Sequence, residues 1–316
     1  MLISVIIWAY RRRKYILEAI ESVLNQTLDR KFYEIVVIKN FKEDQMDNFI
    51  NKKCEKNLYS ENPVQGAMIR EALFYSKGDV ICLLDDDDIF KKEKLEYVFN
   101  LFSSNSDLIY YHHGSILIDE AGNILSTKPI SDPDHNSSSI AVRKDLFINM
   151  EWIDKIDCCF DCVLYYCAID SGKRILSNEE KLSYYRVRSL VHGDMGELVE
   201  STRVYSQKIS NVLIFIRSKM RTDDAKKYVD SYLNSIKCTY FPMFVLQGTD
   251  EKVTIRMIAN FLLTKRFQGQ RIDLSRIVRT VGDIISLIPV SKIKRKILSF
   301  FFRTIYTHIG KLSEQH

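Results

Sequence analysis

The chain has 316 residues, of which 46% are hydrophobic and 11% aromatic, so it can build a sizeable core and is not a disordered protein. Its net charge of +5 is uneven, because the residues from 252 onward contain 13 Lys and Arg against 3 Asp and Glu. An acidic body with a basic C-terminal segment indicates that this segment faces something anionic.

Strands and helices are predicted to alternate over the first hundred residues. Continuous apolar runs predict strands at residues 2–7, 34–38 and 80–84. Apolar residues at helical spacing predict helices at residues 16–24, 46–50, 67–75 and 95–102, the third of them closed by Gly78 at its C-cap position. Such alternation predicts a mostly parallel sheet with right-handed crossovers.

Four consecutive carboxylates, Asp85 to Asp88, directly follow the predicted strand at residues 80–84. Ligands of open α/β sheets bind at this edge, where strands end and helices begin. Carboxylate oxygens suit Mg²⁺ or Mn²⁺, and a diphosphate often completes the shell of such an ion. The alternative is a solvated acidic turn that caps the next helix, but the position after a buried strand favours the metal.

The pattern changes after residue 105. Two strands are expected at residues 108–111 and 115–118, joined by His112-His113-Gly114, and a polar loop begins at residue 131. From residue 197 onward the apolar spacing is helical throughout, and Thr222 with the two following aspartates is a good N-terminal cap.

Cysteine usage and the start of the chain predict a cytoplasmic protein with reduced thiols. The number of cysteines is odd, at seven, and the first methionine leads straight into a strand-like run. Cys158, Cys159 and Cys162 are a weak zinc signal without a second ligand pair, so buried thiols are the favoured interpretation. No apolar run reaches the ~18 residues needed to span a bilayer.

Several of these segments together resemble family 2 glycosyltransferases. The matching pieces are Ser4-Val5-Ile6-Ile7-x-x-Tyr10, Ala19-Ile20-x-Ser22-Val23-Leu24-Asn25-Gln26-Thr27, Glu34-Ile35-Val36-Val37 and Gly78-Asp79-Val80-Ile81-x-Leu83-Leu84-Asp85-x-Asp87-Asp88. The resemblance covers roughly residues 2 to 193. It implies a GT-A type fold, a nucleotide-diphospho-sugar donor, a divalent cation (Mn²⁺ or Mg²⁺) and inversion at the anomeric carbon.

The resemblance also implies a domain organisation. Residues 1–196 would form the GT-A domain, a mostly parallel sheet flanked by helices. Its nucleotide-binding half would span about 1–105 and its acceptor-binding half about 106–196. Residues 197–316 would be a C-terminal helical extension with a basic amphipathic end.

Site residues follow from the positions that match the family. Asp85 and Asp87 would hold the cation, and Asp85 would also reach the ribose or a metal-bound water. Asp88 is either part of this group or a cap of the following helix. The residues expected to bind the nucleotide sugar are Ala9, Tyr10, Arg13, Asn40, Arg70, Asp85, Asp86 and His192.

Asp161 is the expected general base, which inversion requires to deprotonate the acceptor hydroxyl. Its apolar neighbour Phe160 would raise its pKa, and helix capping is the alternative role. Asp157 is the second candidate. His192, beside Gly193, would fold over the diphosphate once the donor binds, unless it is a solvated histidine.

Three positions depart from the family pattern. Lys39-Asn40 replaces the acidic pair that usually recognises the nucleobase and ribose, so the resemblance does not specify the nucleotide. Trp8-Ala9 replaces Pro-Thr and alters the pocket wall beside the base. Arg70 stands where the family often has Asn; it would contact a phosphate, or else form an ordinary surface or core pair.

The C-terminal residues 291–303 combine a cationic cluster with bulky aromatics. On a helix, Ile293, Ile297 and Phe300 share one apolar stripe. Such a helix suits peripheral contact with the inner face of an anionic cell membrane, or packing on the catalytic domain. Nucleic acid is not expected, since no nucleic-acid-binding motif accompanies the charge.

The leading hypothesis is an inverting, metal-assisted glycosyltransferase that uses a glycan or lipid-linked acceptor. A catalytically inactive binding or scaffold protein is the first alternative, favoured by Lys39-Asn40. A sugar-phosphate nucleotidyltransferase ranks last, because the basic run Arg11-Arg12-Arg13 contains none of the glycines that such a loop usually has.

Overall fold

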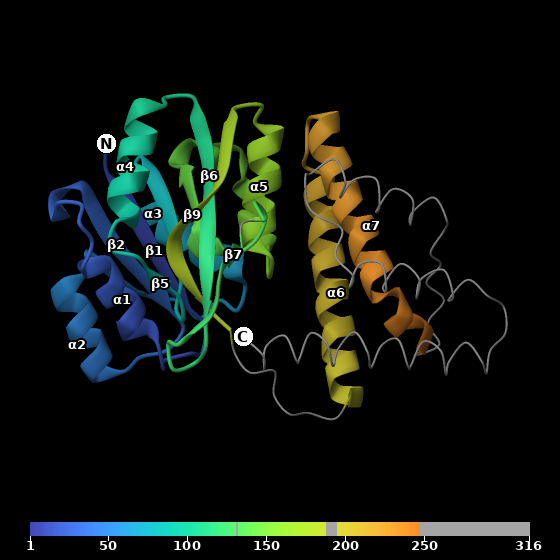
Figure 1. Ribbon diagram of the computed structural model, residues 1–316, viewed down its shortest axis with the longest axis horizontal. Helices are drawn as coiled ribbons and strands as arrows, with labels where there is room; N and C mark the ends of the chain where they lie inside the picture. Colours follow the sequence, from blue (N-terminus) through green and yellow to red (C-terminus); the bar gives the residue numbers. More distant parts are fainter. Residues whose placement is uncertain (131, 188–194, 247–316) are drawn as a thin grey trace. The chain divides into compact units, whose positions relative to one another are not determined.

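The computed structural model describes residues 1–130, 132–187 and 195–246 (Figure 1). The chain divides into two units, Met1–Ser189 and Leu190–His316, and each is described by itself. His192 and the basic segment at residues 291–303 lie outside the described residues.

The described part of the first unit contains one nine-stranded sheet, in the order β3-β2-β1-β4-β8-β6-β9-β5, with β7 paired to β6. The strands are β1 (Ile3–Ala9), β2 (Tyr33–Lys39), β3 (Lys56–Tyr59), β4 (Val80–Asp85), β5 (Ile89–Phe90), β6 (Leu108–Ile118), β7 (Ile124–Ile130), β8 (Ile140–Arg143) and β9 (Arg174–Arg186). The first four in this order, β3 to β4, are parallel, whereas β8 is antiparallel to both of its neighbours. The sheet therefore has a parallel half and a mixed half.

Helices cover both faces of this sheet (Figure 1). They are α1 (Ile16–Leu24), α2 (Asp44–Lys53), α3 (Gln65–Tyr75), α4 (Lys94–Ser104) and α5 (Phe160–Asp170), with short 3-10 turns η1 (Arg30–Phe32), η2 (Ser137–Ser139), η3 (Lys144–Asn149) and η4 (Glu151–Lys155). Alternate residues of β1, such as Ile3 and Val5, share a core with α1, α2 and α4. Ile6 points to the other face and is also fully buried, because α3 packs there against β1 and β2. This two-sided burial explains why β1 is continuously apolar.

Two local predictions are wrong. Residues 108–118 form one strand, β6, that runs through His112-His113-Gly114 and pairs with β7, β8 and β9. Gly78 does not cap α3, whose C-cap is Ser76. A side chain at Gly78 would place its Cβ 2.4 Å from the Ser4 backbone nitrogen, so close backbone approach explains the glycine.

The described part of the second unit is a pair of helices, α6 (Met195–Arg217) and α7 (Asp223–Leu246), in contact with each other. Arg217 forms a bidentate ion pair with Asp230 across the pair. The predicted cap is confirmed, because Thr222 Oγ1 accepts a hydrogen bond of 3.3 Å from the Ala225 backbone nitrogen. Within the described residues, no helix is both long and apolar enough to cross a bilayer.

Candidate active site

The loops after β1 and β4 meet at one edge of the sheet, because these strands are adjacent and parallel and Trp8 lies beside Asp85 in the register. The Trp8 indole Nε1 donates a 2.7 Å hydrogen bond to Asp85 Oδ1. The Trp8 side chain, which departs from the family pattern, therefore holds the first carboxylate of the acidic run in place.

Arg12 lies between the next two carboxylates. Its Nε donates to Asp86 Oδ2 at 3.0 Å and one terminal nitrogen donates to Asp87 Oδ2 at 3.2 Å. The sequence analysis assigned no role to Arg12 and predicted that Arg13 binds the nucleotide sugar. Strand order is the signal that places the basic loop after β1, which contains Arg12, beside the acidic loop after β4.

Asp88 does not cap the following helix, and the interpretation of the acidic run as a solvated cap is wrong. Helix α4 begins at Lys94 with Glu93 at its N-cap, whereas Asp88 Oδ1 accepts a 2.9 Å hydrogen bond from the Arg186 backbone nitrogen. Asp86, Asp87 and Asp88 are all buried. A second hydrogen bond joins Arg186 to the acidic run, because the Arg186 Nε donates to the Asp87 carbonyl at 2.9 Å.

Burial of several like charges dominates the electrostatics of this edge. Burial raises the pKa of Asp85, and the Asp87 carboxylate raises it further. Burial raises the pKa of Asp86 to about 8, an effect that the Arg12 charge only partly offsets. The pKa of Asp87 is also raised by burial. Because these carboxylates are costly to ionise as they stand, added positive charge would be stabilising here.

Asp161 reaches the same edge from a distant part of the chain, in the first turn of α5. It is connected to the end of β4 through one turn, in which Ser138 Oγ accepts a 3.0 Å hydrogen bond from the Asp85 backbone nitrogen. The Asp161 charge adds to the raised pKa of Asp85. The Asn136 backbone nitrogen donates a 2.9 Å hydrogen bond to Asp161 Oδ2. Burial raises the pKa of Asp161, as expected for the base, and the nearby His135 lowers it.

The residues expected around the nucleotide lie along the ends of β1 and β2. Ala9 ends β1 and is fully buried, and Tyr10 lies under the Arg11 guanidinium, 5.2 Å from the ring centroid. Asn40 Oδ1 accepts a 2.6 Å hydrogen bond from the Arg11 backbone nitrogen. This bond stabilises the turn at Arg11, whose φ is positive at 60°. Arg13 lies over the Phe41 ring at 4.4 Å.

Lys39, one of the departures from the family, is turned away from solvent. Its side chain is buried, and its Nζ lies 2.6 Å from Asp47 Oδ1 and 2.9 Å from the Phe41 carbonyl. The ion pair with Lys39 contributes to lowering the pKa of Asp47 to about 2, against the opposing effect of burial. Lys39 therefore has a structural partner of its own.

Two other candidates have different surroundings. Arg70 pairs with η4, donating to the Glu151 carbonyl at 3.1 Å and lying 3.3 Å from Asp154 Oδ2. Asp157, the second candidate base, is exposed and precedes α5. The structure brings neither of them into the contacts described for the carboxylates, and His192 lies outside the described residues.

The carboxylates fit a cation that shares its coordination shell with a ligand. Within the described residues, no three His, Cys, Asp or Glu side chains form a group that could hold an ion alone. Mg²⁺ in phosphate-transfer sites typically takes one or two carboxylates and completes its shell with substrate phosphates and water. The repulsion between Asp85 and Asp87 is the property of this structure that such an ion would relieve.

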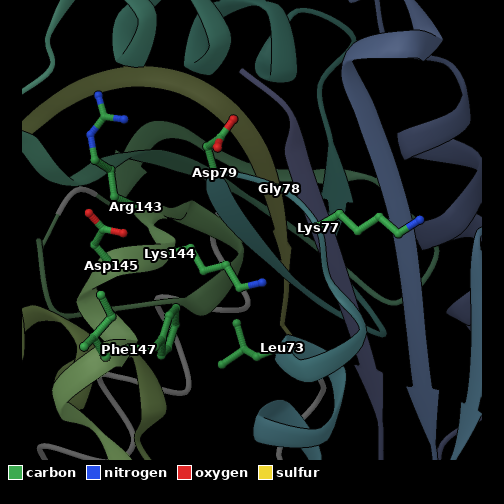
Figure 2. Close-up of a pocket in the computed structure, with 9 residues that line it drawn as sticks. Leu73, Lys77, Gly78, Asp79, Arg143, Lys144, Asp145 and Phe147 are labelled. Atoms are coloured by element: carbon green, nitrogen blue, oxygen red, sulfur yellow. The ribbon is translucent and has the colours of Figure 1, made fainter.

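A cavity of about 540 Å³ lies at the opposite edge of the sheet, where β4 begins (Figure 2). Three of its charged residues have structural partners: Arg143 donates to the Leu108, Phe102 and Asn105 carbonyls, Lys144 donates to the Ser76 carbonyl, and Asp79 accepts from the Leu2 nitrogen. In Figure 2, Lys77 extends away from the other labelled side chains. Nothing in this cavity resembles the clustered carboxylates, so it is not the candidate active site.

The sequence matches the glycosyl transferase family 2 over residues 4–171. An uncharacterized glycosyltransferase of Nostoc sp. is 24% identical over 309 residues, covering 88% of this chain and 86% of that one. The poly(ribitol-phosphate) beta-glucosyltransferase of Bacillus spizizenii is 30% identical over 112 residues, or 33% of this chain, which corresponds to only 18% of that enzyme.

Two solved structures share the fold. The S. aureus TarS fragment 1–349, in complex with UDP, aligns with a TM-score of 0.52 at 17% identity, covering 99% of this chain and 90% of that one. The mannosyltransferase PcManGT from Pyrobaculum calidifontis, with GDP-Man and Mn²⁺, gives 0.56 at 12% identity, covering 99% and 88%. The mixed sheet with helices on both faces is thus a GT-A type fold, and the chain belongs to glycosyl transferase family 2, whose members are glycosyltransferases.

Proposed function

We propose that the chain is an inverting glycosyltransferase that moves a sugar from a nucleotide-diphospho-sugar donor to a hydroxyl of a glycan or lipid-linked acceptor. Asp85 and Asp87 would hold a divalent cation, Mn²⁺ or Mg²⁺, and Asp161 would act as general base. The observation that supports this proposal is that one turn contacts both groups: Ser138 Oγ accepts a 3.0 Å hydrogen bond from the Asp85 backbone nitrogen, and the Asn136 backbone nitrogen donates to Asp161 Oδ2 at 2.9 Å.

The residues of the acidic run suit departure of a diphosphate. Negative charge grows on the leaving oxygen as the bond to sugar C1 breaks, and a cation held by Asp85 and Asp87 would supply charge that offsets it. Arg12 adds a fixed positive charge at the same place, since its guanidinium bridges Asp86 and Asp87. Trp8 keeps Asp85 oriented through its indole hydrogen bond.

Asp161 suits the acceptor side of the reaction. The acceptor oxygen forms a bond to C1 as the C1–diphosphate bond breaks, and the base takes the proton that this oxygen loses. Because burial raises the pKa of Asp161, its carboxylate is a better proton acceptor than an ordinary aspartate. Membership of the family favours this activity over the scaffold and nucleotidyltransferase alternatives.

The related proteins guide the choice of donors to test. UDP is bound by TarS and GDP-Man by the Pyrobaculum enzyme, whereas Lys39 and Asn40 make this chain depart from the usual nucleotide contacts. The first experiment is therefore to measure release of UDP or GDP from UDP-glucose, UDP-GlcNAc and GDP-mannose. Each donor is incubated with Mn²⁺, with Mg²⁺ and with EDTA, and NMR of the product gives its anomeric configuration.

Asp87→Asn is the decisive variant, with Asp107→Asn as its matched control. Asp107 is an exposed carboxylate that makes one long ion pair, 3.9 Å, with Arg174. We expect Asp87→Asn to lower turnover by at least about 100-fold and Asp107→Asn to leave it unchanged, with both variants folded. Full turnover by Asp87→Asn, or turnover that EDTA does not affect, would overturn the metal assignment.

We also propose a cytoplasmic protein that contacts the inner face of the cell membrane through residues 291–303. The basic and aromatic composition of this segment supports the proposal. Co-sedimentation of the full chain with phosphatidylglycerol vesicles, but not with phosphatidylcholine vesicles, is the expected result. Equal recovery with both would favour the alternative, that the segment packs on the protein.

A further inference from the structure

A short turn before β8 contacts both sides of the candidate active site, the Asp85 backbone and the Asp161 carboxylate. It contains Asn136 and the 3-10 turn η2, and all of its residues are buried. The sequence analysis identified only a polar loop in this region. Its residues Ser138 and Asn136 connect the acidic run to Asp161.

Ser138 is attached to the acidic run. Its Oγ accepts a 3.0 Å hydrogen bond from the Asp85 backbone nitrogen. Its carbonyl accepts from the Nζ of Lys94, a fully buried lysine, at 2.5 Å. The end of β4 therefore has its position fixed relative to Ser138.

Asn136 is attached to the expected base. Its backbone nitrogen donates to Asp161 Oδ2 at 2.9 Å, and this direction of the N–H group depends on a positive φ of 65°. Its side chain maintains that conformation, because Oδ1 accepts from the Ser138 nitrogen at 3.0 Å and Nδ2 donates to Ser115 Oγ at 3.0 Å. Asparagine tolerates positive φ better than most residues do, and residues held in such conformations cluster at active sites.

We propose that Asn136 and Ser138 are positioning residues that together fix the separation between Asp85 and Asp161. This inference rests on the proposed function, in which Asp85 belongs to the diphosphate side and Asp161 to the acceptor side. The two carboxylates come from different elements, β4 and α5, and the link from Asn136 to Ser138 is only three residues long and internally hydrogen-bonded. Positioning of this kind matters, because a displacement of about 1 Å can lower a rate by about 100-fold.

Three variants of the full chain test the link. Asn136→Gly accepts the positive φ and removes the side chain, Ser115→Ala removes one of its supports from β6, and Ser138→Ala releases the Asp85 nitrogen. The measurement is the steady-state release of UDP or GDP from UDP-glucose, UDP-GlcNAc and GDP-mannose with Mn²⁺. We expect Asn136→Gly and Ser115→Ala to lower kcat by about 10- to 100-fold with unchanged donor KM. Ser138→Ala is expected to raise donor KM by a similar factor.

Ser137→Ala is the matched control. Ser137 belongs to the same turn and is equally buried, but among the described residues no hydrogen bond of its hydroxyl ties it to either carboxylate. Its kinetic constants should match those of the wild type, whereas a merely structural turn would give all four variants similar losses. Should Asn136→Gly fail to fold, Ser115→Ala reports on the same support.

The outcomes separate this inference from the proposed function. If Asn136→Gly and Ser115→Ala keep the wild-type kcat while Asp161→Asn loses it, the positioning role is wrong and the general base stands. If Asp161→Asn keeps the wild-type kcat, the proposed function fails, and the positioning role fails with it. A kcat loss confined to Asn136→Gly and Ser115→Ala, with KM affected only by Ser138→Ala, supports the inference.

Discussion

The two ends of β4 carry charged residues in opposite situations. Where β4 begins, Asp79 and Lys77 are exposed, and Arg143 gives its hydrogen bonds to backbone carbonyls beside a sizeable cavity (Figure 2). Where β4 ends, Asp86 and Asp88 are buried together, and burial raises both of their pKa values.

The candidate active site is therefore assigned from its electrostatic environment and not from cavity size. Charges at the start of the strand are solvated or matched by dipoles, which stabilises the fold and leaves no interaction for a ligand to improve. Carboxylates at the end of the strand are crowded beyond what Arg12 and Arg186 offset, so a cationic ligand has a favourable interaction to make. The following predictions test this contrast.

The largest effect is expected from Asp161→Asn, which removes the proton acceptor and keeps the size of the side chain. We expect kcat to fall by about 10² to 10⁴-fold with the fold intact. The wild-type kcat should also decline as pH falls, at a higher pH than for an ordinary aspartate, because burial raises the pKa of Asp161 and the base must be ionised. Asp157→Asn, at the exposed neighbouring carboxylate, is the control and should keep the wild-type kcat. If instead Asp157→Asn loses kcat and Asp161→Asn keeps it, Asp157 is the general base.

Arg143→Met should give the largest effect at the other end of β4, and it should be an effect on stability alone. The guanidinium serves three carbonyls at 2.8–2.9 Å, so its loss should lower the free energy of unfolding by about 2 kcal/mol. Urea denaturation gives this value, and donor KM should be unchanged. Lys77→Met, at an exposed residue of the same cavity, should stay within about 0.5 kcal/mol. A rise in donor KM in either variant would contradict the view that only the carboxylate end of β4 binds the donor.

A smaller effect is expected in the pH dependence of stability. Burial raises the pKa of Asp86 from its ordinary 3.8 to about 8. Between these values the folded chain binds more protons than the unfolded chain, so this group makes the free energy of unfolding fall as pH rises. From pH 5 to pH 8, without divalent cations, the wild type should lose on the order of 2 kcal/mol more than Asp86→Asn does in urea denaturation. Parallel pH dependences in the two proteins would show that Asp86 ionises normally.

Arg70→Ala should have the smallest effect. The Arg70–Asp154 pair is partly exposed, with side chains 54% and 42% accessible, and such pairs contribute less than about 1 kcal/mol. Isothermal titration with UDP and GDP in Mn²⁺ should give the wild-type affinity. A clear loss of affinity would instead support the expectation from the sequence that Arg70 contacts a phosphate.

Much of the fold could be predicted from the sequence, because the signals are local. The apolar run before Asp85 indicates a buried strand whatever its neighbours are, and Thr222 caps α7 through a residue three positions away. The wrong predictions at Gly78 and at residues 112–114 concern residues whose structure depends on distant parts of the chain. A glycine indicates a turn in the sequence, but here close packing against another strand requires the one at position 78.

The sequence by itself determined the α/β alternation, the family and the acidic run at a strand end, since each of these is written in neighbouring residues. Only the tertiary structure decided that Arg12 contacts the carboxylates, that Trp8 holds Asp85, and that Asn136 contacts Asp161. The physical reason is that these contacts join residues far apart in the chain. Their formation depends on strand order, register and burial, which no local pattern of residues encodes.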